Sequence, residues 1–294
     1  MSATPDRRLR AISIAPAARR WLESTQHARV LYAFESVVNL VNEDAHVLSL
    51  VSADLGDGPF SIVLEDFPSD VQADASLLVF ENGLWLQDWL IDAEEAPLWQ
   101  PTPNWQTLGS QPALLAPAAR QIAELLAKHS PEDSLARLVL NPLASSSLPV
   151  RILQAAEQNI PLLFAALKQP DGAKLREAAK KLAGLGPGLT PAGDDLLLGA
   201  MYGLWATQPP IAAEQTAQEI AAIATERTHA LSAAWLAAGA RGEAAAPWHQ
   251  LIDAIAAQNP KAIEIAVMRI LPTGHTSGAD ALAGFLGVLE GWQP

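Results

Sequence analysis

The chain has 294 residues, of which 32 are acidic and 19 are basic, so its formal charge is −13 and its sequence pI is about 4.8. Phosphate contacts need clustered Lys and Arg, and this charge balance therefore argues against a nucleic-acid partner. Half of the residues are hydrophobic and 17% are charged, which excludes a largely disordered chain. Because the sequence contains no cysteine, it has no disulfide framework, thiolate metal site or cysteine nucleophile.

No segment predicts a membrane span. The longest apolar run is Leu196–Ala206 (LLLGAMYGLWA), whereas a spanning helix needs about 20 apolar residues. Near the amino terminus, the apolar stretch AISIAPAA lies between arginines and is too short and proline-interrupted for a secretory signal. We therefore expect a cytoplasmic protein with no membrane partner.

Strand-like sequence extends from Arg29 to Leu90, where short apolar, β-branched and aromatic runs are separated by turn dipeptides. The dipeptides Asp57-Gly58 and Asn82-Gly83 tolerate the positive φ of tight hairpin turns, and each lies between two apolar runs. This pattern predicts an antiparallel β-meander of about five strands that forms a barrel-like domain.

A proline-rich segment and a set of helices follow. Residues 99–117 contain four prolines, which interrupt hydrogen bonding in helices and central strands, so we expect a linker there. Ser130-Pro131 has the form of a helix start. Beyond the linker, helical spacing of Ala and Leu predicts helices over 117–128, 149–168, 171–184, 194–207, 213–239, 246–257, 260–270 and 278–292. The sequence thus predicts an α+β fold, with a β-rich domain over 1–112 and a larger α-helical domain over 113–294.

The most unusual segment is Gly184–Gly199, GLGPGLTPAGDDLLLG. Its glycines allow positive φ or close approach to a ligand, and its prolines stiffen the loop. The loop leads into a predicted helix amino terminus, where unpaired N–H groups and the helix dipole favour an anionic oxygen. The spacing matches neither a P-loop nor a dinucleotide-binding fingerprint.

A second segment, Gly274–Gly284 (GHTSGADALAG), resembles the first. Without a gap, Gly193-x-Asp195-x-Leu197-x-Gly199 matches Gly278-x-Asp280-x-Leu282-x-Gly284. We predict two similar loop-to-helix elements whose amino termini converge on one pocket. Backbone N–H groups and the hydroxyls of Thr190, Thr276 and Ser277 would bind ligand oxygens there. The aspartates would bind amide N–H groups, or a hard cation such as magnesium held by Asp194, Asp195 and Asp280.

A purely structural interpretation of these segments stays open. An Asp in a first helical turn stabilises the helix dipole by about 0.3–1 kcal/mol, and glycines spaced near one helical turn permit close helix packing. This interpretation does not explain why two aspartates stand side by side. Adjacent Asp194 and Asp195 repel each other, and only one of them can cap the helix.

Three further features supply polar groups. His275 lies inside the second glycine loop, where a neutral imidazole could act as a general base or could simply bond to the backbone. Residues 225–243 predict a helix with Thr225, Thr228, His229 and Ser232 on one face, which suits a pocket lining or a buried polar contact. Asn39 lies within the apolar strand FESVVNL.

From these features we select two groups of candidate residues. The candidate catalytic residues are Asp194, Asp195, His275 and Asp280. The candidate substrate-binding residues are Gly186, Gly188, Thr190, Gly193, Thr228, Thr276, Ser277, Gly278 and Asn39.

Four segments together resemble the AllH family, which includes a subunit of oxamate carbamoyltransferase: FESVVNL, GLGPGLTPAGDDLLLG, the Thr-rich segment at 225–243 and GHTSGADALAG. The resemblance extends roughly from Val30 to Leu289. It implies a part in anaerobic allantoin and purine nitrogen catabolism, in which three different proteins assemble to convert oxalurate and phosphate into oxamate and carbamoyl phosphate. The Ser-Thr-Arg-Thr phosphate loop of ordinary transcarbamoylases is absent, so we do not expect that fold.

The first functional hypothesis is a transferase subunit that acts with other subunits on phosphate and a small carbamoyl-containing carboxylate. Asp194 and Asp195 would orient an amide or a magnesium ion, His275 would handle a proton or stabilise charge, and the glycine loops would bind oxyanions. One alternative is a non-catalytic metabolite-binding or assembly subunit. Another is a stand-alone hydrolase of amides or phosphate esters. Only the enzyme hypotheses predict that Asp195→Asn abolishes turnover with intact folding.

Overall fold

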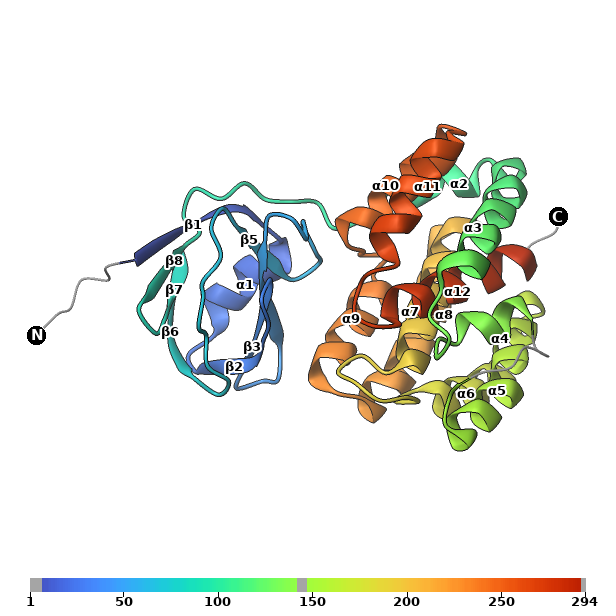
Figure 1. Cartoon of the computed structure of the whole chain (residues 1–294), viewed down its shortest axis with the longest axis horizontal. Helices are drawn as coiled ribbons and strands as arrows, with labels where there is room; N and C mark the ends of the chain where they lie inside the picture. Colours follow the sequence, from blue (N-terminus) through green and yellow to red (C-terminus); the bar gives the residue numbers. More distant parts are fainter. Residues whose placement is uncertain (1–6, 142–146, 292–294) are drawn as a thin grey trace, which may run out of the picture. The chain divides into compact units, whose positions relative to one another are not determined.

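The computed structural model describes residues 7–141 and 147–291, and the chain divides into two compact units. The first unit runs to Pro101 and also contains Ala244–Ala246, while the second comprises Thr102–Glu243 and the residues from Pro247 onward. Strands come first and a helical region follows, which confirms the predicted α+β fold (Figure 1). None of the described helices combines the length and apolarity that crossing a membrane requires.

The first unit is a closed eight-stranded barrel with the strand order β1-β5-β4-β3-β2-β6-β7-β8. Closure depends on β1, which pairs antiparallel with β5 and parallel with β8. β4 and β5 are also parallel, and the other neighbours are antiparallel. The strands are β1 (Arg7–Ile14), β2 (Ala28–Ala33), β3 (Val37–Asn42), β4 (Val47–Ser52), β5 (Ser61–Leu64), β6 (Ser76–Phe80), β7 (Gly83–Leu86) and β8 (Trp89–Asp92).

The barrel therefore has more strands than the predicted five, and four of its pairings are not those of a meander: β1 with β5, β1 with β8, β2 with β6 and β4 with β5. β1 lies outside the predicted strand region because arginines occupy outward positions of its alternating sequence, RRLRAISI. The hairpin predicted at Asp57-Gly58 is wrong, since the strands on either side of it are parallel. The predicted turn at Asn82-Gly83 is displaced by one residue, because Gly83 already pairs with Phe80 across β6 and β7.

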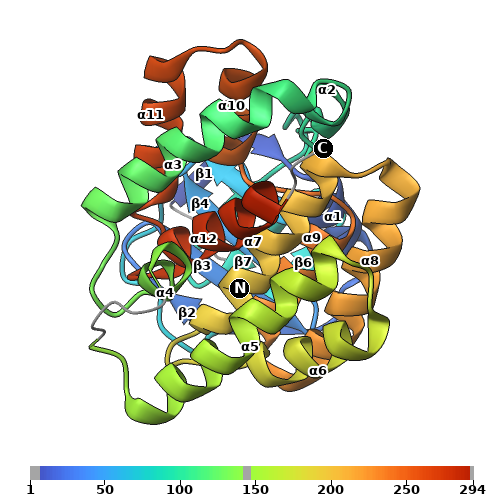
Figure 2. The ribbon, with the colours of Figure 1, turned by 90° about the vertical axis from the view of Figure 1, so that its right-hand side faces the viewer.

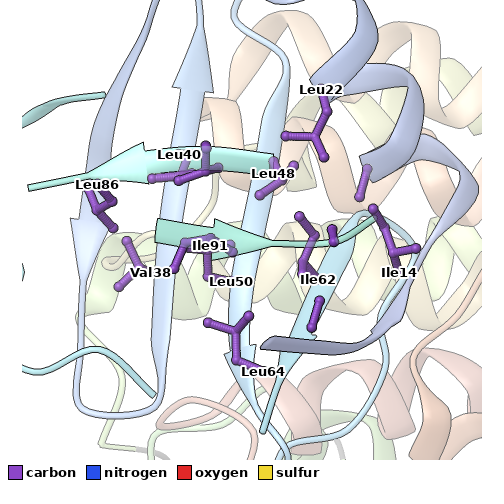
Figure 3. Packing of buried hydrophobic residues seen from close by; sticks show 14 of the residues in the cluster. Ile14, Leu22, Val38, Leu40, Leu48, Leu50, Ile62, Leu64, Leu86 and Ile91 are labelled. Atoms are coloured by element: carbon purple, nitrogen blue, oxygen red, sulfur yellow. The ribbon is translucent and has the colours of Figure 1, made fainter. Parts of the chain in front are cut away.

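Alternate strand residues fill the barrel interior, as Figure 3 shows. Burial of each Leu or Ile side chain contributes about 1.5–3 kcal/mol. A short helix, α1 (Pro16–Ser24), adds Trp21 and Leu22 to the same core and begins with a proline at its first position. The interior strand residues include Val38, Leu40, Leu48, Leu50, Ile62, Leu64, Leu86 and Ile91.

The second unit is helical. Its elements are α2 (Trp105–Gly109), the 3₁₀ turn η1 (Pro112–Leu114), α3 (Leu115–His129), α4 (Ala136–Leu140), α5 (Val150–Lys168), α6 (Gly172–Leu182), α7 (Ala192–Thr207), α8 (Pro210–Ala224), the 3₁₀ turn η2 (Thr225–Arg227), α9 (Ala230–Ala240), α10 (Ala246–Ala256), α11 (Pro260–Ile270) and α12 (Ser277–Gly291). Residue 292 of the predicted helix 278–292 lies outside the described residues.

Three sequence predictions in this unit need correction. The predicted linker over 99–117 contains α2, η1 and the start of α3. The helix start expected at Ser130-Pro131 begins a turn instead, and α4 starts at Ala136. The helices predicted over 213–239 and 225–243 are broken at Thr228, where the backbone is extended (φ −133°) between η2 and α9. The side-chain contacts described below explain this break.

Helices α7 and α12 lie next to each other (Figures 1 and 2) and are buried on all sides, as expected for apolar sequences without an amphipathic face. Glycines allow their backbones to touch. A Cβ atom at Gly199 would lie 1.7 Å from the Ala281 oxygen, and one at Gly284 would lie 2.0 Å from the Leu196 oxygen. Further along, Gly203 faces Val288. Residues further along α7 contact residues further along α12, as in Gly199 with Ala281 and Gly203 with Val288. The two helices are therefore parallel, and their amino termini lie at the same end of the pair.

This helix pair belongs to an internal repeat that is longer than the sequence match indicated. α5–α6–α7 corresponds to α10–α11–α12. In both copies the middle helix has 11 residues and an N-cap Asx side chain, Asp171 in one and Asn259 in the other. The preceding turns also match, because the Asp171 N–H donates to Ala166 O (3.3 Å) and the Asn259 N–H to Ala254 O (3.0 Å).

Buried positions coincide along the repeat as well. Leu163, Ala166, Leu167, Leu175, Ala178, Ala179 and Leu182 correspond to Leu251, Ala254, Ile255, Ile263, Ala266, Val267 and Ile270, all of which are buried. The loops differ in length. The Gly193 N–H donates to Leu185 O and the Gly278 N–H to Thr273 O, so the first loop is three residues longer (185–193 against 273–278).

We expect Gly284→Ala to lower the free energy of unfolding of the helical unit by about 2 kcal/mol or more, because overpacking costs roughly 1–3 kcal/mol and the new methyl group would meet backbone atoms. The thermal unfolding midpoint measures this loss. Gly109→Ala is the matched control, since the nearest neighbour of its Cβ would be 3.9 Å away. Equal midpoints for the two variants would contradict the close contact.

Candidate functional site

The two loop-to-helix elements meet where the amino termini of α7 and α12 lie together. The loops approach each other through Thr190 and Ser277, whose hydroxyl oxygens are 2.9 Å apart. Both side chains are half-buried, as is Thr276. These hydroxyl groups form a polar layer, and the carboxyl groups of Asp195 and Asp280, one helical turn further into α7 and α12, lie beneath it.

Asp195 and Asp280 occupy equivalent positions, the fourth residue of each helix, and both are buried, with exposed fractions of 6% and 0%. Asp280 Oδ1 accepts hydrogen bonds from the Ser134 hydroxyl and the Leu135 N–H, both at 2.7 Å. The Oδ2 atoms of both aspartates are buried and have no hydrogen-bond partner among the described residues. Each of these two aspartates therefore has one carboxyl oxygen that the described chain leaves without a hydrogen bond.

Burial governs the protonation of both groups. It raises the pKa of Asp195 well above its ordinary value, and the charge of Asp280 raises it further. The Ser277 and Thr190 hydroxyls act in the opposite direction. Burial also raises the pKa of Asp280 to about 7, although hydrogen bonds from Ser134, Thr276 and backbone N–H groups act to lower it. The pair therefore retains a proton to a higher pH than ordinary carboxyl groups do.

Asp194 has a different environment, although it is also buried. Its Oδ1 accepts the Gly184 N–H (2.8 Å), and its Oδ2 accepts the hydroxyls of Ser232 (2.8 Å) and Thr228. Burial raises the pKa of Asp194, and these hydrogen bonds oppose that shift. Asp194 thus ties the first loop to the amino terminus of α9. This bonding explains why the chain is extended at Thr228 and not helical.

His275 lies apart from the buried carboxyl groups. Its side chain is 78% exposed, and its Nε2 is 2.9 Å from Asp133 Oδ2 in the turn before α4. The same turn supplies Ser134 to Asp280, so it contacts both the second loop and the helix that follows. Ser134 could not be found from the sequence, because the Ser130-Pro131 pattern predicts a helix there and its partner Asp280 lies 146 residues away.

The candidate glycines have two kinds of role. Gly186 (φ +121°) and Gly188 (φ +98°) adopt backbone conformations that side chains disfavour, and space around Gly188 is open. Gly193 and Gly278 are instead sites of close backbone approach, to Leu182 O and Ile270 O respectively. Asn39 belongs to the other compact unit, where it is buried in β3 and accepts a hydrogen bond from Ser49 Oγ (2.7 Å).

The three aspartates do not form one metal centre. Across 7–141 and 147–291, no group of three or more His, Asp or Glu side chains is arranged to hold a metal ion. Both oxygens of Asp194 are already hydrogen bonded. These residues therefore do not fit the suggested magnesium site.

Comparison with known proteins agrees with this two-unit architecture. The family model described as "AllH family N-terminal domain" matches residues 10–98, which span the barrel. The model described as "Oxamate carbamoyltransferase subunit AllH" matches residues 182–289, from the end of α6 through both glycine loops into α12. No solved structure matches the chain.

The matches define a class of protein in which an amino-terminal β unit is joined to a helical unit that carries paired glycine loops. The chain belongs to the AllH family. Its two matched regions cover most of the chain, and the family description is that of a subunit in an oxamate carbamoyltransferase.

We expect Asp194→Ala to lower the free energy of unfolding by about 2–4 kcal/mol, because it leaves the Gly184 N–H and two hydroxyls without their acceptor, and each buried unpaired group costs about 1–3 kcal/mol. Chemical denaturation measures the loss. Asp253→Ala on α10 is the control, since Asp253 is exposed and surface changes fall within about 0.5 kcal/mol. Equal losses would show that Asp194 is no tie between the loop and α9.

We also expect the thermal stability of the helical unit to fall as the pH rises from about 4 to 7. Because the pKa of Asp280 is about 7 in the folded protein and its ordinary value is 3.8, the folded protein keeps a proton that the unfolded chain releases in this range. The contribution is on the order of a few kcal/mol at about 1.4 kcal/mol per pKa unit.

Asp280→Asn removes this titration while its amide oxygen can still accept from Ser134 and Leu135. Thermal midpoints of the two proteins between pH 4 and pH 8 test the assignment. The variant should show a flatter profile, with a remaining slope from Asp195, whose pKa is shifted in the same direction. Parallel profiles would rule out Asp280 as the titrating group.

Proposed function

We propose that this chain is a subunit of an assembly that converts oxalurate and phosphate into oxamate and carbamoyl phosphate, within the breakdown of allantoin and other purine nitrogen compounds. The family match is the observation that carries the proposal. In this reaction the bond between the carbamoyl carbon and the oxamate nitrogen breaks, a bond from that carbon to a phosphate oxygen forms, and the oxamate nitrogen gains a proton.

The helical unit offers groups suited to each end of such a ligand. The Thr190, Thr276 and Ser277 hydroxyls can donate to carboxylate, carbonyl or phosphate oxygens. At the helix amino termini, the N–H groups of Gly193, Asp194, Gly278 and Asp280 already donate within the chain. The Asp195 and Asp280 carboxyl groups can accept from amide N–H groups. Orientation and charge stabilisation would then carry the transfer, without a covalent nucleophile.

The remaining candidates have more distant roles in this proposal. Asp194 is a positioning residue that fixes the first loop through Gly184 and α9 through Ser232. His275 is the group that would handle the proton, with one ring nitrogen held by Asp133. Cytoplasmic location and the participation of other subunits belong to the same proposal.

A second candidate function is that of a non-catalytic subunit that binds a metabolite or holds the assembly together. The bonding of Asp194 favours it, because one of the predicted catalytic acids is fully occupied in linking chain segments. The paired glycines of α7 and α12 likewise serve helix packing.

The test is carbamoyl phosphate formation from oxalurate and phosphate, measured for the chain alone and for the chain co-purified with the proteins encoded beside it. We expect turnover in the assembly and a loss of about 10- to 100-fold in Asp195→Asn, the size expected for one hydrogen bond to a charged group. Asp253→Asn should retain full turnover. Circular dichroism verifies folding.

Each other outcome selects a different function. Unchanged turnover in Asp195→Asn would favour the non-catalytic subunit. Turnover by the chain alone would show that it holds a complete site, and hydrolysis of oxalurate without phosphate would indicate an independent hydrolase. No reaction in any combination would remove the substrate assignment and leave family membership intact.

A further inference from the structure

We propose that the Oδ2 atoms of Asp195 and Asp280 together accept the two N–H bonds of a single –NH₂ group, so that the pair is the specificity element for a primary carbamoyl ligand. This inference deepens the proposed function and rests on it for the choice of ligand. It assigns the recognition of the amide end to two residues that act as one unit.

The first support is the unused hydrogen-bonding capacity of these atoms. Buried polar atoms in folded proteins nearly always have a partner, and one that lacks it costs about 1–3 kcal/mol or more. Here one carboxyl oxygen of Asp195 and one of Asp280 both lack a partner among the described residues, while the other oxygen of Asp280 accepts two hydrogen bonds. A ligand that donates to both Oδ2 atoms would remove this cost.

The second support is the kind of side chain that surrounds Asp195 and Asp280. In the described part of the chain neither carboxyl group takes part in an ion pair, and no third acidic or His side chain completes a metal site. The Thr190 and Ser277 hydroxyls lie beside the Asp195 carboxyl group, where hydrogen bonding from them lowers its pKa. Acceptors beside donors complement an amide, which carries N–H donors and a carbonyl acceptor on one carbon.

The third support is the internal repeat. Asp195 and Asp280 are the fourth residues of the equivalent helices α7 and α12, which are parallel and in backbone contact at Gly199 and Gly284. The repeat therefore presents two equivalent acceptors from its two halves. An –NH₂ group has two N–H donors on one nitrogen and matches two acceptors, whereas an N,N-dimethylated or oxygen-substituted group does not.

Calorimetric titration of the chain and of the assembly with oxamate tests the inference without any substitution. We compare oxamate with oxalate, which has oxygen in place of the –NH₂ group, and with N,N-dimethyloxamate, which has no N–H bond. Oxamate should bind at least about tenfold more tightly than either analogue. Equal binding of N,N-dimethyloxamate, or no oxamate binding to either the chain or the assembly, would overturn the inference.

Variants test whether the two residues act together. Asp195→Asn and Asp280→Asn each replace an acceptor by a donor, so each should weaken oxamate binding at least about tenfold, and the double variant should be little weaker than either single one. Asp253→Asn should bind as the natural chain does. Near-ultraviolet circular dichroism identifies any variant that has not folded, and the ligand series on the natural chain decides in that case.

The outcomes also separate this inference from the proposed reaction. Unchanged oxamate affinity in both folded variants would mean that the two carboxyl groups only share a proton with each other, and would overturn the inference even if the assembly turns over. Magnesium binding that depends on both aspartates and excludes oxamate would overturn it as well. Oxamate binding that requires both aspartates, with no turnover by the chain alone or by the assembly, would support the inference and contradict the proposed reaction.

Discussion

The backbone contact between α7 and α12 is the constraint on which the candidate site depends. Glycine at 199 and at 284 lets each helix lie against a carbonyl oxygen of the other. Any side chain at these positions would increase the distance between the two helices. Because the helices are parallel, this contact also fixes the distance between their amino termini. The placement of Asp195 near Asp280, and of Thr190 beside Ser277, follows from it. The glycines that pack the helices and the polar residues that form the site are therefore parts of one arrangement.

Much of this arrangement could be predicted from the sequence, because local patterns specify it. The identities around Asp195 and Asp280 correctly indicated two related loop-to-helix elements, and the helix over 260–270 was predicted with its exact limits. The full three-helix repeat could not be found in the same way, since the additional residues in the first loop shift the numbering and the matched positions share burial more than identity. The break before α9 and the contribution of Ser134 depend on bonds to distant aspartates, which no local pattern contains.

The three buried aspartates show that residue type alone does not determine a role. Asp194 and Asp195 are neighbours in the chain, and both lose hydration on folding. Asp194 regains its hydrogen bonds from groups of the protein, while Asp195 and Asp280 each keep one oxygen without a partner in the described ranges 7–141 and 147–291. A folded protein can tolerate such a cost when the group serves binding, and the same position would be better filled by an apolar side chain if only stability mattered. The hydrogen bonding of these acids thus distinguishes Asp194, which links chain segments, from Asp195 and Asp280, a difference that their spacing in the sequence does not show.

The closure of the barrel has a consequence for how the protein is made. Hydrogen bonds between β1 and β8 close the barrel, so the first described strand pairs with the last strand of the sheet. Pairings between segments far apart in sequence carry a large loop-closure cost and form slowly. During synthesis, the Arg-rich first strand must remain unpaired on this edge until residues near Asp92 have left the ribosome. Its outward arginines keep that waiting strand hydrated and poorly suited to pairing with another chain, which protects the nascent barrel from aggregation.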